Sequence, residues 1–103
     1  MAEVGTVANL PRGEWQVSRV YATLGRAEPA IFHAERCLAY CENAPGALED
    51  WDLPYAYEAL ARAHLVAGNP DQAAHFGAHA RELGERIADE EDREQLNADL
   101  ATI

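Results

Sequence analysis

The chain has 103 residues, of which 49% are apolar and 21 are alanine, so we expect one small domain with a thin core and closely packed helices. It contains eight arginines and no lysine against 18 acidic residues, which gives a net charge of −10. This charge argues against nucleic acid or an anionic membrane as the main partner, and no apolar stretch approaches the ~20 residues of a membrane span.

The first quarter of the sequence predicts an arm followed by one helix. Residues 1–11 mix Gly5, Asn9 and Pro11 with scattered apolar residues, which predicts an extended or mobile N-terminal arm. A helical pattern then runs from Glu14 to the stop at Gly25. One face of this helix carries apolar residues at i, i+3, i+4 and i+7: Val17, Val20, Tyr21 and Leu24.

The next elements alternate between helices and short breaks. We expect a second helix from about Glu28 to Glu42, and then a loop over 44–51 that contains Pro45 and Gly46. Asp52 is the expected N-cap of a third helix over 53–67. This helix is apolar nearly all round, which is typical of a central, buried helix.

Two further helices complete the chain. The fourth starts near Asp71 and carries apolar residues at spacings of three and four as far as Ile87. Asp89 is the expected cap of a fifth helix, with Asp92 three residues later as in a capping box. Its inner face is expected to carry Leu96, Leu100 and Ile103.

The two cysteines indicate a reducing compartment. Cys37 and Cys41 are four residues apart in a helical pattern, and the Cβ spacing of about 5–6 Å at i,i+4 is too wide for a relaxed disulfide. The N-terminus also lacks a basic region followed by an apolar one, so we expect no secretory signal. Both observations favour a cytoplasmic protein.

An internal repeat relates the two halves of the chain. A shift of 43 residues aligns 15–42 with 58–85. Small residues also match, Ser18 with Ala61 and Cys37 with Ala80. The identical pairs are Arg19 with Arg62, Gly25 with Gly68, Ala30 with Ala73, and Glu42 with Glu85.

Each unit resembles a tetratricopeptide repeat, a two-helix hairpin of about 34 residues. The family's positions for a small residue, an aromatic, a turn glycine, an alanine and a second small residue are occupied in both units, over roughly 12–43 and 55–86. They read Ser18, Tyr21, Gly25, Ala30 and Cys37, and then Ala61, His64, Gly68, Ala73 and Ala80. The chain departs from the family at Ala34 and Gly77, where a bulky residue is usual, and in its longer period.

The resemblance implies an all-α fold and a domain organisation. We expect a single domain over 1–103, with two antiparallel helical hairpins over 12–43 and 52–87 as a fragment of a right-handed superhelix. The loop over 44–51 joins them, and a C-terminal capping helix covers 89–103.

The resemblance also implies a concave face, made by the first helix of each hairpin, that binds peptides or partner domains. Carried over by position, that face presents Arg12, Trp15, Arg19 and Thr23, and then Tyr55, Glu58, Arg62 and Val66. The matched Arg19 and Arg62 could bind acidic groups of a partner through their guanidinium groups, and Trp15 and Tyr55 would supply flat contact area. Ordinary intramolecular salt bridges and core packing remain the alternative for these residues.

Metal binding and catalysis are the competing classes of function. His33, Cys37 and Cys41 are spaced i, i+4, i+8, and the outer two lie about 12 Å apart along the axis, so at most one pair could bind one ion. His75 and His79 form a second pair but lack the glutamate of a zinc-protease motif. A small metal-binding or redox helical protein that uses these pairs is therefore the alternative hypothesis.

Signatures of enzymes are otherwise missing from the sequence. It contains no phosphate-binding glycine loop and no nucleophile elbow, and Ser18 is its only serine. The leading expectation is a non-catalytic interaction module without a cofactor, which binds a protein or peptide partner with acidic groups.

The number of repeats predicts self-association. About three units are usually needed to bury a continuous core, and the chain has two. We therefore expect a homodimer, in which Leu10, Phe32, Trp51 and Ile103 are candidates for the open end. The other possibility is that the missing repeats lie on another chain.

Overall fold

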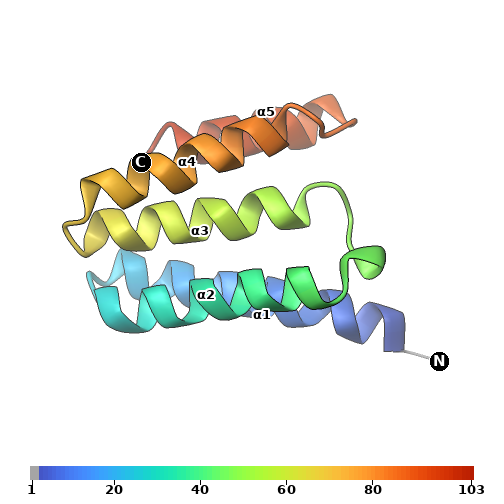
Figure 1. The fold of residues 1–103 in the computed structure, drawn as a ribbon, viewed down its shortest axis with the longest axis horizontal. Coiled ribbons are helices and arrows are strands. Elements are labelled where there is room, and N and C mark those ends of the chain that lie inside the picture. Colours follow the sequence, from blue (N-terminus) through green and yellow to red (C-terminus); the bar gives the residue numbers. More distant parts are fainter. Residues whose placement is uncertain (1–2) are drawn as a thin grey trace.

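The computed structural model describes the backbone of residues 3–103 and the side chains from residue 9 onward. The described residues contain helices and no strand, so the all-α fold class is confirmed (Figure 1). The helices are α1 (Glu3–Thr23), α2 (Ala27–Asn43), α3 (Asp52–Val66), α4 (Pro70–Gly84) and α5 (Glu90–Leu100), and a short 3₁₀ helix at Pro45–Ala47 lies between α2 and α3. None of these helices has the length and apolar character that crossing a bilayer requires.

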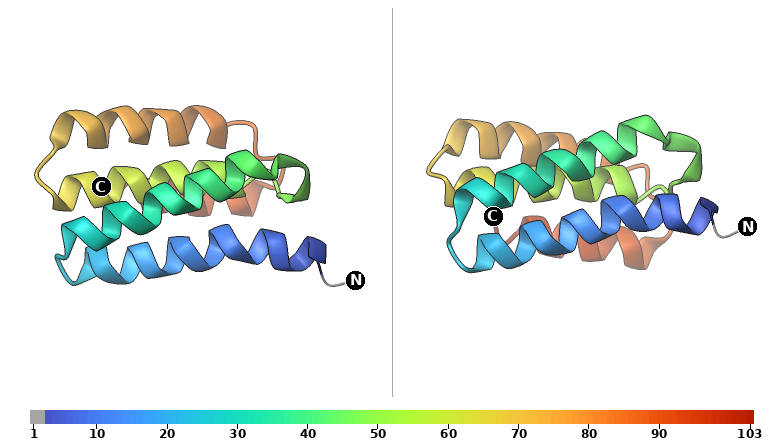
Figure 2. Two further views of the ribbon diagram at one scale, coloured as in Figure 1. Left: turned by 60° about the horizontal axis from the view of Figure 1, so that its bottom comes forward. Right: turned by 90° about the horizontal axis from the view of Figure 1, so that it is seen from below.

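Helix α3 lies at the centre of the molecule, as its composition predicted. It contacts all four other helices, and nine of its 15 residues are buried. Helices α1 and α2 lie on one side of α3, and α4 and α5 lie on the other (Figure 1). In the turned views, α1 and α5 both lie toward one face of the molecule, and α3 lines the groove between them (Figure 2).

The backbone repeats the 43-residue period of the sequence. Gly25 and Gly68 adopt φ of 74° and 80°, the left-handed conformation that glycine adopts readily. The N–H groups of Gly25 and of the residue after it donate to the carbonyls of Ala22 and Tyr21. At Gly68 the acceptors are Leu65 and His64, each 43 positions further along. The two hairpin turns therefore have the same hydrogen bonds.

Small residues lie where the helices of each hairpin cross. Ser18 and Ala30 are buried, and the Ser18 hydroxyl donates to the Ala30 carbonyl at 2.8 Å. Ala61 and Ala73 occupy the matching positions of the second hairpin and are also buried. The absence of bulk at these positions lets the paired helices approach closely.

The N-terminal part of the chain differs from the expected arm. Helix α1 starts at Glu3 rather than at Glu14, and residues 1–2 lie outside the described part. Pro11 had suggested a break, since proline gives no N–H to the carbonyl four residues earlier. Here the helix continues through Pro11, whose ring is fully buried against the rest of the fold. Packing of the proline ring offsets the lost hydrogen bond.

Helix α1 also turns a different face to the core than its periodicity suggests. Val17, Val20 and Leu24 belong to the apolar face found in the sequence, but all three are exposed. The buried positions are Pro11, Ser18 and Ala22, with Trp15 half-buried among them. Small and ring-shaped side chains therefore make the contact with α2 and α3.

Helix α5 is held by two leucines and a capping aspartate. Leu96 and Leu100 are buried, as predicted, and Ile103 packs half-buried against the same cluster beyond the helix end. The Asp89 carboxylate accepts from the N–H of Glu91 at 2.8 Å, so Asp89 is the predicted N-cap. Asp52, by contrast, is the first residue of α3, and Trp51 occupies the cap position.

Candidate peptide-binding groove

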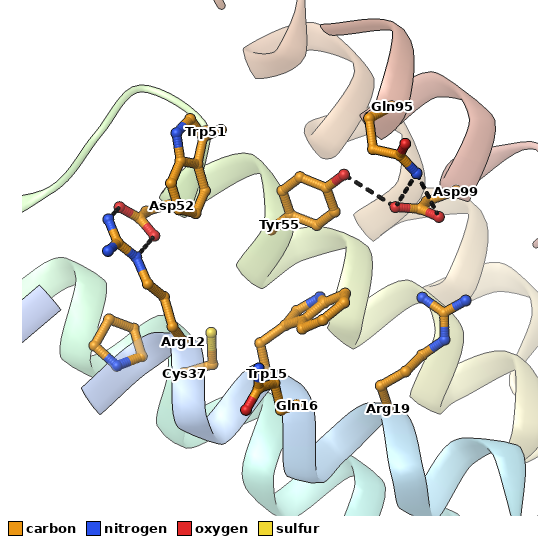
Figure 3. A pocket seen from close by; sticks show the side chains of 11 residues that line it. Arg12, Trp15, Gln16, Arg19, Cys37, Trp51, Asp52, Tyr55, Gln95 and Asp99 are labelled. Carbon is orange, nitrogen blue, oxygen red and sulfur yellow. Dashed lines mark hydrogen bonds and ion pairs between the residues drawn. The ribbon is translucent and has the colours of Figure 1, made fainter. Parts of the chain in front are cut away.

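A groove of about 680 Å³ lies between α1 and α5, and α3 forms its floor (Figure 3). Helix α1 contributes one wall, α5 contributes the other, and Trp51 closes one end. The lining residues are Pro11, Arg12, Trp15, Gln16, Arg19, Cys37, Trp51, Asp52, Tyr55, Gln95 and Asp99. Four of the eight residues that the resemblance assigned to the concave face are among them: Arg12, Trp15, Arg19 and Tyr55.

Aromatic rings form much of the surface of the groove. Trp15 and Tyr55 pack edge to face, with 5.5 Å between ring centroids and an interplanar angle of 87°. The guanidinium of Arg12 stacks over Trp51 at 4.4 Å from the ring centroid. Trp15 and Trp51 are the two tryptophans of the chain. Flat, half-buried rings of this kind offer contact area at a low cost in conformational entropy.

Arg12 and Asp52 form a structural pair at one end of the groove. The Nε and Nη2 atoms of Arg12 donate to the two oxygens of Asp52, both at 2.9 Å. Asp52 is buried and also accepts the N–H of Glu49 at 2.9 Å. The hydrogen bonds with Asp52 raise the pKa of the Arg12 guanidinium. Arg12 therefore joins α1 to the start of α3, which leaves it less free to bind a partner.

Glu58 lies beneath the groove instead of facing it. The side chain is fully buried, and its Oε1 accepts from Trp15 Nε1 at 2.8 Å. Its Oε2 accepts from Arg62 Nη2 at 2.8 Å and from Arg62 Nε at 3.1 Å. These contacts satisfy the carboxylate within the fold, as a buried charge requires.

The matched arginines Arg19 and Arg62 have different surroundings. The Arg62 guanidinium also donates to the Asp99 carbonyl at 3.0 Å and to the Thr102 hydroxyl at 2.8 Å, and its side chain is 14% exposed. Arg62 thus ties α5 to α3. The nearest carboxylate oxygen to Arg19 is Oε2 of Glu58 at 3.7 Å, too far for a hydrogen bond, and the Arg19 side chain is 34% exposed. Arg19 is therefore more exposed than Arg62 and is bound less tightly by the rest of the fold.

Helix α5 supplies groove residues that the sequence analysis missed. The Tyr55 hydroxyl donates to Asp99 Oδ2 at 2.9 Å, and Gln95 lies beside them on the wall of the groove (Figure 3). Burial, together with the bond to Asp99, raises the pKa of the Tyr55 phenol. Gln95 and Asp99 each precede an inner-face leucine, and this position was the one signal in the sequence that places them near the core.

The remaining two positions assigned to the concave face do not line the groove. Thr23 is exposed, and its hydroxyl donates to the carbonyl of Arg19 at 2.9 Å. Val66 packs, half-buried, with Ala22, Ala30 and Ala63. Both lie near the hairpin turns, beyond the end of the groove.

The histidine and cysteine pairs are engaged in contacts within the fold. His33 Nδ1 lies 2.6 Å from Glu14 Oε1, and the His79 ring stacks on Tyr57. The rings of His75 and His79 are 4.9 Å apart, edge to face. Cys37 is buried, and its hydrogen bond with Cys41 and its burial raise the pKa of its thiol. Within residues 9–103, no three histidine, cysteine or acidic side chains form a group that could hold a metal.

Comparison of the chain with models of protein families, with curated proteins and with solved structures finds no match.

Proposed function

We propose that the chain is a non-catalytic interaction module of the tetratricopeptide type, which binds a peptide segment of a partner protein in the groove between α1 and α5. The repeat of the hairpin turns at a 43-residue offset supports the family resemblance. The single observation that carries the binding proposal is the groove itself, which is lined by aromatic rings together with polar and charged side chains. An apolar surface with a few convergent polar groups is typical of a binding site.

Arg19 is the residue that we expect to recognise an acidic group of the peptide. Glu58 keeps its hydrogen bonds with Arg62 and Trp15 if the Arg19 side chain moves away. A ligand can therefore bind Arg19 without leaving the buried Glu58 carboxylate unpaired. A guanidinium binds a carboxylate through two parallel hydrogen bonds. Arg19 also lies over the Trp15 ring, 5.8 Å from its centroid, where an apolar side chain of the same peptide could pack.

The charges around the groove favour a peptide with few acidic groups. Arg12, Arg19 and Arg62 balance Asp52, Glu58 and Asp99, so these six residues carry no net charge, whereas the chain as a whole carries −10. A strongly acidic segment would be repelled by the rest of the molecule. We therefore propose a ligand with one carboxylate next to an aromatic or aliphatic side chain.

A fluorescence titration tests this function. Peptides are selected from a random library on the wild-type chain, and peptides that also bind the Arg19→Glu variant are discarded. Because both tryptophans line the groove, a bound peptide should change the intrinsic fluorescence. Arg19→Ala should weaken the binding of the selected peptides by about tenfold or more, as for a hydrogen bond to a charged group.

Arg86→Ala is the matched control, since Arg86 is exposed beyond the end of α4 and outside the groove. This variant should bind with wild-type affinity. Failure to select any peptide, or equal losses in the Arg19 and Arg86 variants, would overturn the proposal.

A further inference from the structure

A second surface of the molecule lies on a side of α1 that does not line the groove. The face of α1 opposite its buried residues carries an outer stripe, which we define as Leu10, Gly13, Val17 and Val20 with Leu24 directly after the helix end. Four of the six large hydrophobic side chains that are exposed among the described residues belong to this stripe, with exposed fractions between 39% and 65%. The spacing alternates between three and four residues over about 21 Å of helix, which is the spacing of a helix-packing seam.

The outer stripe is also free of charge. Between residues 9 and 25, the charged side chains are those of Arg12, Glu14 and Arg19, and all three turn toward other parts of the chain. Arg12 pairs with Asp52, Arg19 lies beside Glu58, and Glu14 accepts from Arg36 at 2.8 Å. Residues 49–103 contain 13 acidic residues and four arginines, a net charge of −9. Most of the acidic excess therefore lies on elements other than α1, and a contact through the outer stripe buries no charged side chain of the stripe.

The sizes of the residues in the stripe complement each other when one copy is reversed. In the antiparallel register that sets Val17 of one copy against Val20 of the other, Gly13 faces Leu24. A Cβ at Gly13 would meet no atom within 4 Å, so the space above this residue is open for a leucine. A parallel pairing would set glycine against glycine and leave a gap, which close-packed interfaces avoid.

We propose that a second copy of this chain packs on the outer stripe of α1, with the two α1 helices antiparallel about a twofold axis. The dimer buries an uncharged apolar face and leaves the groove between α1 and α5 open in each copy. Of the residues expected at an open end, Leu10 belongs to the outer stripe, and Phe32 is exposed on the neighbouring α2. Trp51 and Ile103 instead pack against the core cluster of α5.

Solution mass tests the proposal on the full chain. Light scattering or sedimentation from micromolar to submillimolar concentrations should show a species of twice the 11.3 kDa of one chain. Val17→Glu should give the single-chain mass, because a charge would be buried at the centre of the seam. Leu65→Glu is the matched control: Leu65 is 43% exposed on α3, outside the stripe, and this variant should remain dimeric.

Gly13→Leu tests the antiparallel pairing itself. The new side chain has open space within one chain and improves helix propensity, so the helical circular dichroism signal should be kept. It would clash with Leu24 of the second copy, and dimerisation should weaken by about tenfold.

Three results would overturn the proposal. A wild-type chain that stays monomeric throughout the concentration range excludes the dimer. Equal behaviour of the Val17 and Leu65 variants excludes the outer stripe as the interface. Tighter dimerisation of Gly13→Leu excludes the antiparallel pairing. None of these measurements involves the groove or a peptide, so their failure is distinct from failure of the proposed function.

Discussion

At the scale of single residues, the groove rests on one buried carboxylate. Glu58 is fully buried, and it binds the indole of Trp15 on α1 and the guanidinium of Arg62 on α3. Arg62 in turn binds the end of α5 through the Asp99 carbonyl. One side chain thus holds three helices in the arrangement that forms the groove.

Removal of this carboxylate should destabilise the fold strongly. Glu58→Ala leaves the Arg62 guanidinium, whose side chain is only 14% exposed, without its anion, and loss of one partner of a buried pair costs about 3–5 kcal/mol. Chemical denaturation measures the change in the free energy of unfolding. Glu82→Ala, at an exposed position on α4, should differ from wild type by less than about 0.5 kcal/mol. Similar stabilities of the two variants would contradict the role given to Glu58.

The raised pKa of Tyr55 should make the folded chain less stable at alkaline pH. Burial and the bond to Asp99 raise the pKa of its phenol in the folded chain above the value of about 10 in the unfolded chain. Folding therefore retains a proton that the unfolded state releases, so stability falls as the pH rises above about 10. The chain contains no lysine, whose side chain would titrate in the same pH range. Tyr55→Phe should lose less stability than wild type between pH 9 and 11, as measured by urea denaturation; an equal loss would contradict this prediction.

At the scale of helices, sequence periodicity predicted most elements but not their orientation. The helices from α2 to α5 and the two glycine turns follow from hydrophobic spacing and end signals. The start of α1 could not be predicted in this way, because tertiary packing decides whether a helix can accommodate Pro11. The apolar face of α1 was found, but periodicity does not state whether such a face meets the core or a partner.

The site was predictable only as far as the repeat extends. Positions on α1 and α3 followed from the family resemblance, and Trp15, Arg19 and Tyr55 do line the groove. The α5 wall lies beyond the repeat, so nothing in the spacing indicated that Gln95 and Asp99 would face α1. The different environments of Arg19 and Arg62 also depend on α5, which reaches only Arg62.

Two glycines of α4 give opposite predictions for the attachment of α5. A Cβ at Gly84 would lie 2.5 Å from Leu96 Cδ2, and Leu96 is fully buried, so Gly84→Ala should cost about 1–3 kcal/mol. A Cβ at Gly77 would meet its nearest atom, Arg81 Nη1, at 3.6 Å. Gly77→Ala should therefore gain up to about 1 kcal/mol through helix propensity. Thermal or chemical unfolding measures both, and a stabilised Gly84→Ala would contradict the packing of α5 described above.

At the scale of the whole molecule, two surfaces with different chemistry lie on different sides of α1. The groove side carries aromatic rings and balanced charges, whereas the outer stripe is apolar and uncharged. A dimer through the outer stripe would present two grooves at once. Two linked grooves would bind a partner with two suitable segments more tightly than one groove can.

The most direct test of the proposed function is to locate a bound peptide by nuclear magnetic resonance. A library-selected peptide is added to the labelled chain, and the shifts of the two indole N–H signals, from Trp15 and Trp51, are followed with those of the backbone. If the peptide occupies the groove, both indole signals should move, together with the amides of Arg19 and of Gln95 and Asp99 on α5. Shifts confined to the outer stripe of α1 or to α4, with both indole signals unchanged, would contradict the proposed function.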